Sequence, residues 1–285
     1  MFSRLLKHEW RASSGLLGML SLAAAGIGIL ATVVLRILVN TSDSLWWDTA
    51  EGLGVILVVA LGMFLFFSVV ALSVYAIAVQ VILLYRFYKN KYTDEGYLTF
   101  TLPVKPTQIF WSSFLNMLIW LIISVLVVFS VVFLAVLFGT AEHGLVNTDV
   151  FDAMKDLLEF FRVIDWQMLL QEQYSIPYLI VLGLTFLLTP FYALFVPMAC
   201  ITAGAVLAKK HKILASFGVY YGVNFVVGII TSVVSVVPTI LMMSSQDPEG
   251  LYLVSMAIQL VISLALTIGA YCFTIHTMKK KLNLP

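Results

Sequence analysis

The chain has 285 residues, of which 61% are hydrophobic and only 11% carry a charge. Soluble domains are about 45–50% apolar and about 25% charged, so a single core cannot hide this excess and lipid must solvate much of the chain. The net charge of +1 gives no field that would attract nucleic acid. Cys200 and Cys272 have neither disulfide nor ligand spacing, and we expect both to be buried packing residues.

The first eleven residues have two faces if they are helical. The apolar face holds Phe2, Leu5, Leu6 and Trp10, and the basic face holds Arg4, Lys7, His8 and Arg11. This pattern predicts an interfacial helix over 1–14, with its tryptophan at the membrane surface and its basic groups toward lipid phosphates. The alternative is a basic flank of the first span. The apolar run that follows reaches Leu38, which is too long for a signal-peptide core, so we expect a retained span.

Six apolar runs are each long enough to cross a hydrocarbon core, which requires about 20 helical residues. They cover approximately residues 15–38, 53–84, 108–138, 176–207, 213–243 and 251–278. The period-two alternation of a membrane barrel is absent. The sequence therefore predicts an all-α integral membrane protein with six transmembrane helices, forming a single transmembrane domain over 1–285.

Lysine and arginine are distributed asymmetrically about these spans. Thirteen of the sixteen lie at the N-terminus, in the connections after spans two and four, or in the C-terminal tail. The other three are Arg36, Lys155 and Arg162. Because cytoplasmic connections are enriched in basic residues, we expect both termini and the connection after the second span to face the cytoplasm.

The longest connection, 139–175, is then expected on the outer side of the membrane. Apolar residues recur three and four apart in its middle, at Val150, Phe151, Met154, Leu157, Leu158, Phe161 and Ile164. This spacing predicts an amphipathic helix. We expect it to pack on the outer rim of the bundle, and the alternative is a gate or lid.

Several chemistries lack their signatures in this chain. No predicted span carries a charged residue deep in its apolar core, which argues against a proton relay or an ion-coupled carrier. There is no HExxH, no GxSxG and no phosphate-binding loop. We therefore expect a chain that is not an enzyme and that holds neither a cofactor nor a metal.

Uncharged polar residues inside the spans are the remaining candidates for a functional site. Four of them, Tyr192, Asn224, Ser235 and Gln259, are candidates for a substrate path. The alternative is ordinary hydrogen bonding between helices. The sequence GVYYG, from Gly218 to Gly222, predicts a close helix contact, either within the bundle or with a partner.

A polar segment, 86–107, separates the second and third apolar runs. Thr93 is placed to cap a short helix, Asp94 and Glu95 complement its dipole, and Gly96 permits a tight backbone. The apolar residues of this helix are Tyr97, Leu98, Phe100 and Leu102, followed by Pro103. Such a surface suits a groove on another protein, and the alternative is a turn that buries these side chains in lipid.

The run DEGYLTFTLP, from Asp94 to Pro103, is followed by a polar turn and a new span. It resembles the second cytoplasmic connection of type-2 ATP-binding-cassette (ABC) permeases of Gram-positive bacteria. The opening MFSRLLKHEWR resembles the N-terminal surface helix of the same family. The resemblance implies that 86–107 carries a coupling helix that docks on a separate ATPase subunit, where ATP and Mg²⁺ are bound. The coupling residues would be Thr93, Asp94, Glu95, Gly96, Tyr97, Leu98, Phe100, Leu102 and Pro103.

The same resemblance implies an exporter of a peptide, a drug or a lipid-like molecule in the bacterial cell membrane. A six-span chain is half of the usual twelve, so a second permease chain, identical or different, is implied. The acidic outer connections suit a cationic peptide or reflect charge asymmetry alone. Two alternatives remain open: a non-transporting immunity or scaffold protein that binds its target at the outer face, and an intramembrane enzyme, which the missing motifs disfavour.

Overall fold

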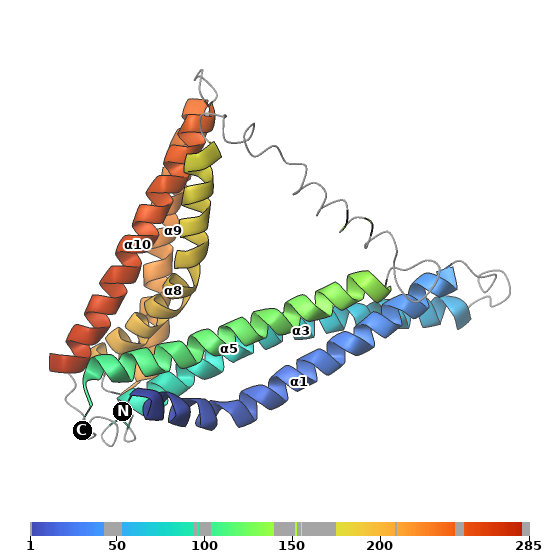
Figure 1. Cartoon of the computed structure of the whole chain (residues 1–285), viewed down its shortest axis with the longest axis horizontal. Coiled ribbons are helices and arrows are strands. Elements are labelled where there is room, and N and C mark those ends of the chain that lie inside the picture. Colours follow the sequence, from blue (N-terminus) through green and yellow to red (C-terminus); the bar gives the residue numbers. More distant parts are fainter. Residues whose placement is uncertain are drawn as a thin grey trace. The chain divides into compact units, whose positions relative to one another are not determined.

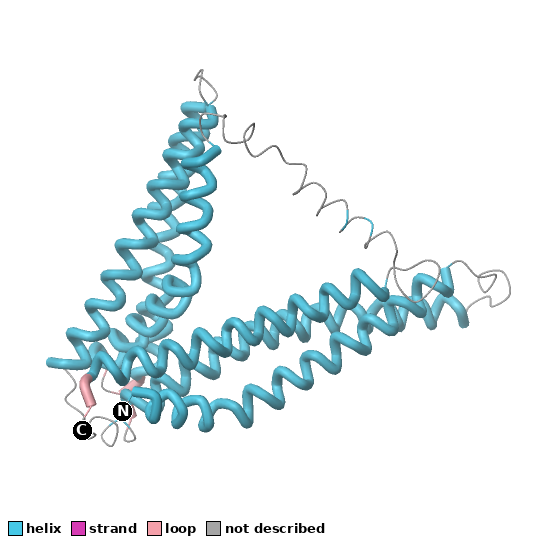
Figure 2. Tube along the Cα trace, viewed as in Figure 1, coloured by secondary structure: helices cyan, strands magenta, loops and turns pink. Residues whose placement is uncertain are grey.

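A computed structural model describes residues 2–42, 53–93, 96, 104–139, 152, 155, 175–208, 210–242 and 248–280. Its helices are α1 (Phe2–Ser42), α3 (Leu53–Tyr92), α5 (Pro106–Leu134), α8 (Ser175–Leu207), α9 (Lys212–Met242) and α10 (Pro248–Lys280) (Figure 1). A π-helical turn, η1 (Ala135–Gly139), continues α5. No strand occurs in the described part of the chain (Figure 2). The prediction of an all-α protein is confirmed.

Each of the six helices is long and apolar enough to cross a membrane. The most apolar 18-residue window has a mean hydropathy of 1.9 in α9 and of 3.2 in α5 with its π-helical turn. A helix satisfies every backbone polar group within its own segment, which is what a solvent without hydrogen-bonding groups demands. The prediction of six transmembrane helices is therefore confirmed.

Two helices extend more than a full turn beyond the apolar runs that predicted them. α3 continues past residue 84 to Tyr92, so the first residues of the polar segment 86–107 are its last two turns. Residues 2–14 are helical, as expected, but they are continuous with the first span in α1. The basic residues Arg4, Lys7 and Arg11 are exposed, whereas Trp10 is partly buried. The amphipathic helix predicted within 139–175 lies outside the described residues.

The described helices divide into two compact units. The N-terminal unit comprises residues 7–83 and 119–164. The Trp10 ring stacks on Trp120 with centroids 4.9 Å apart, and the Trp120 indole N–H donates a hydrogen bond of 3.0 Å to Ser13 Oγ. Ser21 Oγ and the Tyr75 hydroxyl are 2.9 Å apart, which joins α1 to α3. Trp10 therefore has a partner within the protein, in addition to any contact it makes with lipid.

Two further contacts bring α1 against α5 in this unit. A Cβ on Gly28 would overlap the Val131 side chain, so only glycine permits the approach at this point. Farther along, the Arg36 guanidinium donates a hydrogen bond of 2.9 Å from Nη1 to the Phe138 carbonyl. This carbonyl belongs to the π-helical turn, where the usual intrahelical pairing changes.

The C-terminal unit comprises residues 1–6, 84–118 and 165–285. α8, α9 and α10 pack side by side in it (Figure 1). Its core contains an aromatic cluster of Phe110, Trp111 and Phe114 from α5, Phe195 from α8 and Tyr271 from α10. Ring centroids are 4.7 Å apart for Phe114–Phe195 and 5.4 Å apart for Phe110–Tyr271. Phe110 is 0% exposed, so the cluster holds the start of α5 against two other helices.

Candidate functional site

One end of the C-terminal unit collects its basic residues. α3, α8 and α10 finish there and α5 and α9 begin there, which brings Lys91, Lys105, Lys210, Lys212 and Lys279 to this end. The described residues at the opposite end, 175–185, 232–242 and 248–258, contain no lysine or arginine. We call the first of these the basic end. Its lysines are among the thirteen basic residues from which we predicted that the polar segment 86–107 faces the cytoplasm.

Tyr92, the last residue of α3, is fastened to two other helices at the basic end. Its hydroxyl lies 2.6 Å from Thr202 Oγ1 of α8. Thr202 donates its own hydroxyl hydrogen to the Met198 carbonyl at 2.8 Å, so Tyr92 is the donor in the bond to Thr202. Lys212, the first residue of α9, donates from Nζ to the Tyr92 carbonyl at 3.4 Å. Tyr92 is 3% exposed and Thr202 is 0% exposed, and we call this arrangement the Tyr92 anchor.

The chain turns sharply just after the Tyr92 anchor. Thr93 donates from Oγ1 to the Lys89 carbonyl at 2.6 Å, and the Gly96 N–H donates to the Thr93 carbonyl at 2.8 Å. A Cβ on Gly96 would lie 2.5 Å from the Lys91 carbonyl oxygen, so this position requires glycine, as the sequence predicted. The Thr93 hydroxyl hydrogen is thus engaged in the last turn of α3.

The other predicted coupling residues lie outside the described part of the chain. They are Asp94, Glu95, Tyr97, Leu98, Phe100, Leu102 and Pro103. Within the segment, the structure describes the end of α3 through Thr93, Gly96, and the chain from Val104 into α5.

α8, α9 and α10 line a half-open hollow of about 270 Å³ with polar side chains in its wall, which we call the polar hollow. Two of the four predicted path residues, Tyr192 and Gln259, line it together with Thr185, Thr231 and Ser263. Each of the last three donates its hydroxyl hydrogen to a carbonyl of its own helix, at 2.6, 2.9 and 2.9 Å. Their oxygens therefore remain available as acceptors.

Asn224 and Ser235, the other two predicted path residues, are not in the wall of this hollow. Asn224 donates from Nδ2 to the Tyr220 carbonyl at 2.8 Å, within α9. Ser235 donates from Oγ to the Thr231 carbonyl at 2.7 Å, also within α9. Asn224 and Ser235 are therefore on α9, which contributes to the wall of the polar hollow, but neither side chain lines it.

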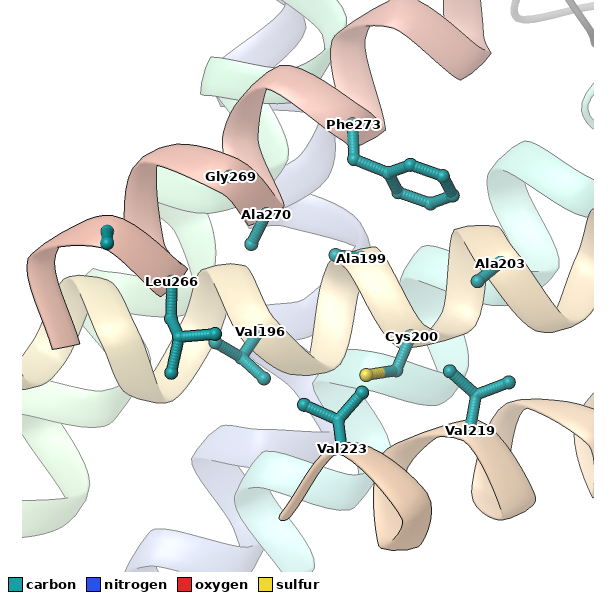
Figure 3. Close-up of a pocket in the computed structure, with 11 residues that line it drawn as sticks. Val196, Ala199, Cys200, Ala203, Val219, Val223, Leu266, Gly269, Ala270 and Phe273 are labelled. Carbon is teal, nitrogen blue, oxygen red and sulfur yellow. The ribbon is translucent and has the colours of Figure 1, made fainter. Parts of the chain in front are cut away.

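A second hollow, of about 280 Å³, lies between the same three helices and is almost wholly apolar. Its wall includes Val196, Ala203, Val219, Gly269 and Phe273 (Figure 3). Cys200 contributes the one heteroatom among its side chains, and Figure 3 shows this thiol turned toward α9. We call it the apolar hollow. Leu266 lines both hollows, so the two lie next to each other along α10.

The cysteine prediction is half right. Cys200 is a buried free thiol, as expected, because it packs between α8 and α9 in the wall of the apolar hollow. Cys272 is also free but is exposed on α10, so the prediction that it is buried is wrong. Its position inside an apolar run identified the helix but did not identify the side of the helix that faces the protein.

The Tyr92 anchor attaches to two of the helices that wall the apolar hollow. Thr202 lies next to Ala203, which lines the hollow, and Lys212 begins the helix that supplies Val219. α8 and α9 also touch closely here, since a Cβ on Gly204 would overlap both backbone and side chain of Ser216. Motion of the end of α3 would therefore reach both helices that wall the hollow.

The GVYYG sequence does not make the contact expected within the bundle. A Cβ added at Gly218 or Gly222 would meet nothing within 4 Å in the described structure. The close helix approaches are instead at Gly28 and Gly204, neither of which the sequence motif indicated.

Among the described residues, no group of three or more His, Cys, Asp or Glu side chains is placed to hold a metal ion. No family model, no curated protein and no solved structure matches this chain.

Proposed function

We propose that this chain is the membrane-spanning permease subunit of an ABC exporter in the bacterial cell membrane. A separate ATPase subunit, which binds ATP and Mg²⁺, docks on the cytoplasmic segment 86–107, and a second permease chain completes the transporter. The observation that carries the proposal is the Tyr92 anchor. A segment that resembles a coupling helix leaves α3 at the residue that is hydrogen-bonded to both α8 and α9.

In this proposal, motion of the ATPase reaches the hollows through the end of α3. A partner that holds the residues after Tyr92 and changes its own shape displaces the end of α3. The buried hydroxyl bond to Thr202 and the lysine bond from Lys212 carry that displacement to α8 and α9. These two helices wall both hollows, so ATP-driven motion in the partner alters the space available to a substrate.

The test begins with purification of the full-length tagged chain from its native membranes in mild detergent, followed by identification of co-purified subunits. We expect an ATPase with a phosphate-binding loop in the complex. Replacing Asp94, Glu95 and Tyr97 together with alanine should lower its yield at least fivefold while the chain stays inserted. Recovery of no such ATPase, or undiminished recovery with the triple variant, would contradict the proposal and favour an immunity or scaffold protein.

The Tyr92 anchor makes a separate prediction in the same complex. In the complex whose chain carries Cys272→Ser, which leaves Cys200 as the chain's one thiol, ATP with vanadate should change the rate at which a thiol reagent labels Cys200 by about threefold. Tyr92→Phe removes the hydroxyl alone, so it should retain the ATPase yet lose this nucleotide-dependent change. Tyr85→Phe, a matched variant of an exposed tyrosine on the same helix, should behave like wild type. If Tyr92→Phe and Tyr85→Phe showed the same nucleotide-dependent change in labelling, the Tyr92 hydroxyl would not be part of the coupling.

A further inference from the structure

We infer that the two hollows together form one binding groove for an uncharged amphipath, a molecule with an apolar chain and a hydrogen-bonding group that carries no net charge. The inference names the substrate class of the proposed exporter and in that respect rests on the proposed function. The binding itself concerns only α8, α9 and α10 and requires no ATPase.

The groove has the length of a membrane-embedded ligand. Its α8 wall runs from Thr185 to Ala203, which corresponds to about 27 Å at 1.5 Å per residue. This is close to the thickness of the hydrocarbon core, about 30 Å. The hollows of about 270 and 280 Å³ share Leu266, and together they fall within the range of small-molecule sites, about 300–1,000 Å³.

The polar hollow supplies unmatched hydrogen-bonding groups. Within the described helices, no hydrogen bond joins the Gln259 amide or the Tyr192 hydroxyl to another residue. Thr185, Thr231 and Ser263 offer acceptor oxygens beside them. Amides without partners are costly in hydrocarbon, so this wall favours a ligand that brings both donors and acceptors.

Charge is absent from both walls. None of the residues that line either hollow is Asp, Glu, Lys, Arg or His. An ionised group brought here would lose its hydration and gain no opposite charge. The groove therefore selects against a cationic peptide, which the acidic outer connections had left open, and equally against an anionic headgroup.

The apolar hollow determines the orientation of the ligand. The apolar hollow exists because the side chains around it are small, namely those of Ala199, Ala203, Gly269 and Ala270. Cys200 adds only a weakly polar thiol. Because this hollow lies beside the Tyr92 anchor, the apolar chain points toward the basic end. The hydrogen-bonding group then sits beside Gln259.

Cys200 provides a native reporter of occupancy, since it lines the apolar hollow and is 4% exposed. The full chain carrying Cys272→Ser would be reconstituted in nanodiscs and labelled with a small methanethiosulfonate. Three probes share a ten-carbon chain: 1-decanoylglycerol is uncharged, decanoate is anionic and decyltrimethylammonium is cationic. We expect 1-decanoylglycerol to slow labelling at least threefold and the charged probes to change it by less than 1.5-fold.

Two amide variants separate the groove from a general effect of the bilayer. Gln259→Leu should abolish the protection, because it removes the unpartnered amide of the polar hollow. Asn224→Leu removes an amide from α9 that lines neither hollow, so protection should persist. A shift in thermal unfolding temperature with the same probes and variants provides a second measurement that does not depend on thiol reactivity.

Equal protection by charged and uncharged probes would overturn the assignment of ligand class. No protection and no thermal shift with any probe would overturn the groove itself, leaving bilayer lipid or a second copy of the chain to cover the hollows. Because the reconstituted chain contains no ATPase, protection by 1-decanoylglycerol would stand even if no ATPase co-purifies. Conversely, absent protection in a chain that does recruit an ATPase would reject only the groove.

Discussion

Two sets of hydroxyl groups in the C-terminal unit differ in where their hydrogen bonds lead. At the basic end, the Tyr92 hydroxyl bonds across to Thr202 Oγ1 of α8. Ser216 shares its hydroxyl hydrogen between the Lys212 carbonyl of its own helix, at 2.8 Å, and the Ile201 carbonyl of α8, at 3.3 Å. In the polar hollow, the hydroxyls bond to carbonyls of their own helices. Bonds between membrane helices contribute about 0.6–2 kcal/mol each, so the first set holds helices together. The second set, the hydroxyls of Thr185, Thr231 and Ser263, joins no two helices, and its oxygens remain available as acceptors in the wall of the hollow.

Residues of the same chemistry within one unit therefore differ in role, since some join helices and others line the polar hollow. One end of the bundle is fastened by aromatic contacts, a close glycine approach and buried hydroxyl bonds. The adjoining region is open and lined by groups without partners in other helices. Substitutions in the fastened end should therefore lower stability, whereas those in the lining should alter ligand binding and leave stability almost unchanged.

The largest expected effect comes from breaking the aromatic cluster at the fastened end. Phe110→Ala removes a fully buried ring that contacts Phe195 and Tyr271, and should lower the free energy of unfolding by about 3–5 kcal/mol. Equilibrium unfolding in mixed detergent micelles measures the change. Phe186→Ala, at a position 78% exposed on the chain surface, is the control and should change it by less than about 0.5 kcal/mol. Similar losses in both variants would show that the cluster is not the main fastening.

A smaller loss is expected where α8 and α9 touch. In Gly204→Ala the new methyl group would collide with the Ser216 backbone, and this overpacking should cost about 1–3 kcal/mol. Gly218→Ala places the same methyl group in open space within a helix, so it should be neutral or stabilise by up to about 1 kcal/mol. The same unfolding measurement compares the two variants. If Gly204→Ala left the free energy of unfolding unchanged, the close contact between α8 and α9 at Ser216 would be contradicted.

A comparison of two threonines separates fastening from lining, and the second of them has the smallest expected effect. Thr202→Val leaves the buried Tyr92 hydroxyl without its acceptor and should cost about 1–3 kcal/mol. Thr231→Val makes the same chemical change in the polar hollow, where only a bond within α9 is lost. It should alter the free energy of unfolding by less than about 0.5 kcal/mol. Equal losses at the two threonines would mean that the hollow is also a fastened region.

The helices were predictable because lipid selects for apolar length. The six runs located the six candidate spans of the described residues. α3 nevertheless extends two turns farther than its run, since Arg86 through Lys91 remain helical after the apolar residues stop. Hydropathy reports solvent preference and does not report where the backbone stops being helical. α1 begins at Phe2 for the same reason.

The candidate site was predictable only in part, because composition identifies a helix but not the direction in which a side chain points. Tyr192 and Gln259 line the polar hollow, whereas Asn224 and Ser235 do not. The bond from Tyr92 to Thr202 joins residues 110 positions apart, and nothing in the local sequence of either indicates it. The aromatic cluster was missed because the apolar residues of α5 show little helical periodicity, so no pattern marks its packed face.

The contact between Gly204 and Ser216 has a consequence for natural sequence variation. Only glycine fits at residue 204 without separating α8 from α9, whereas Gly218 and Gly222 face open space despite forming the recognisable motif. Homologous chains that keep this bundle should therefore retain glycine at the first position and drift freely to alanine or serine at the other two.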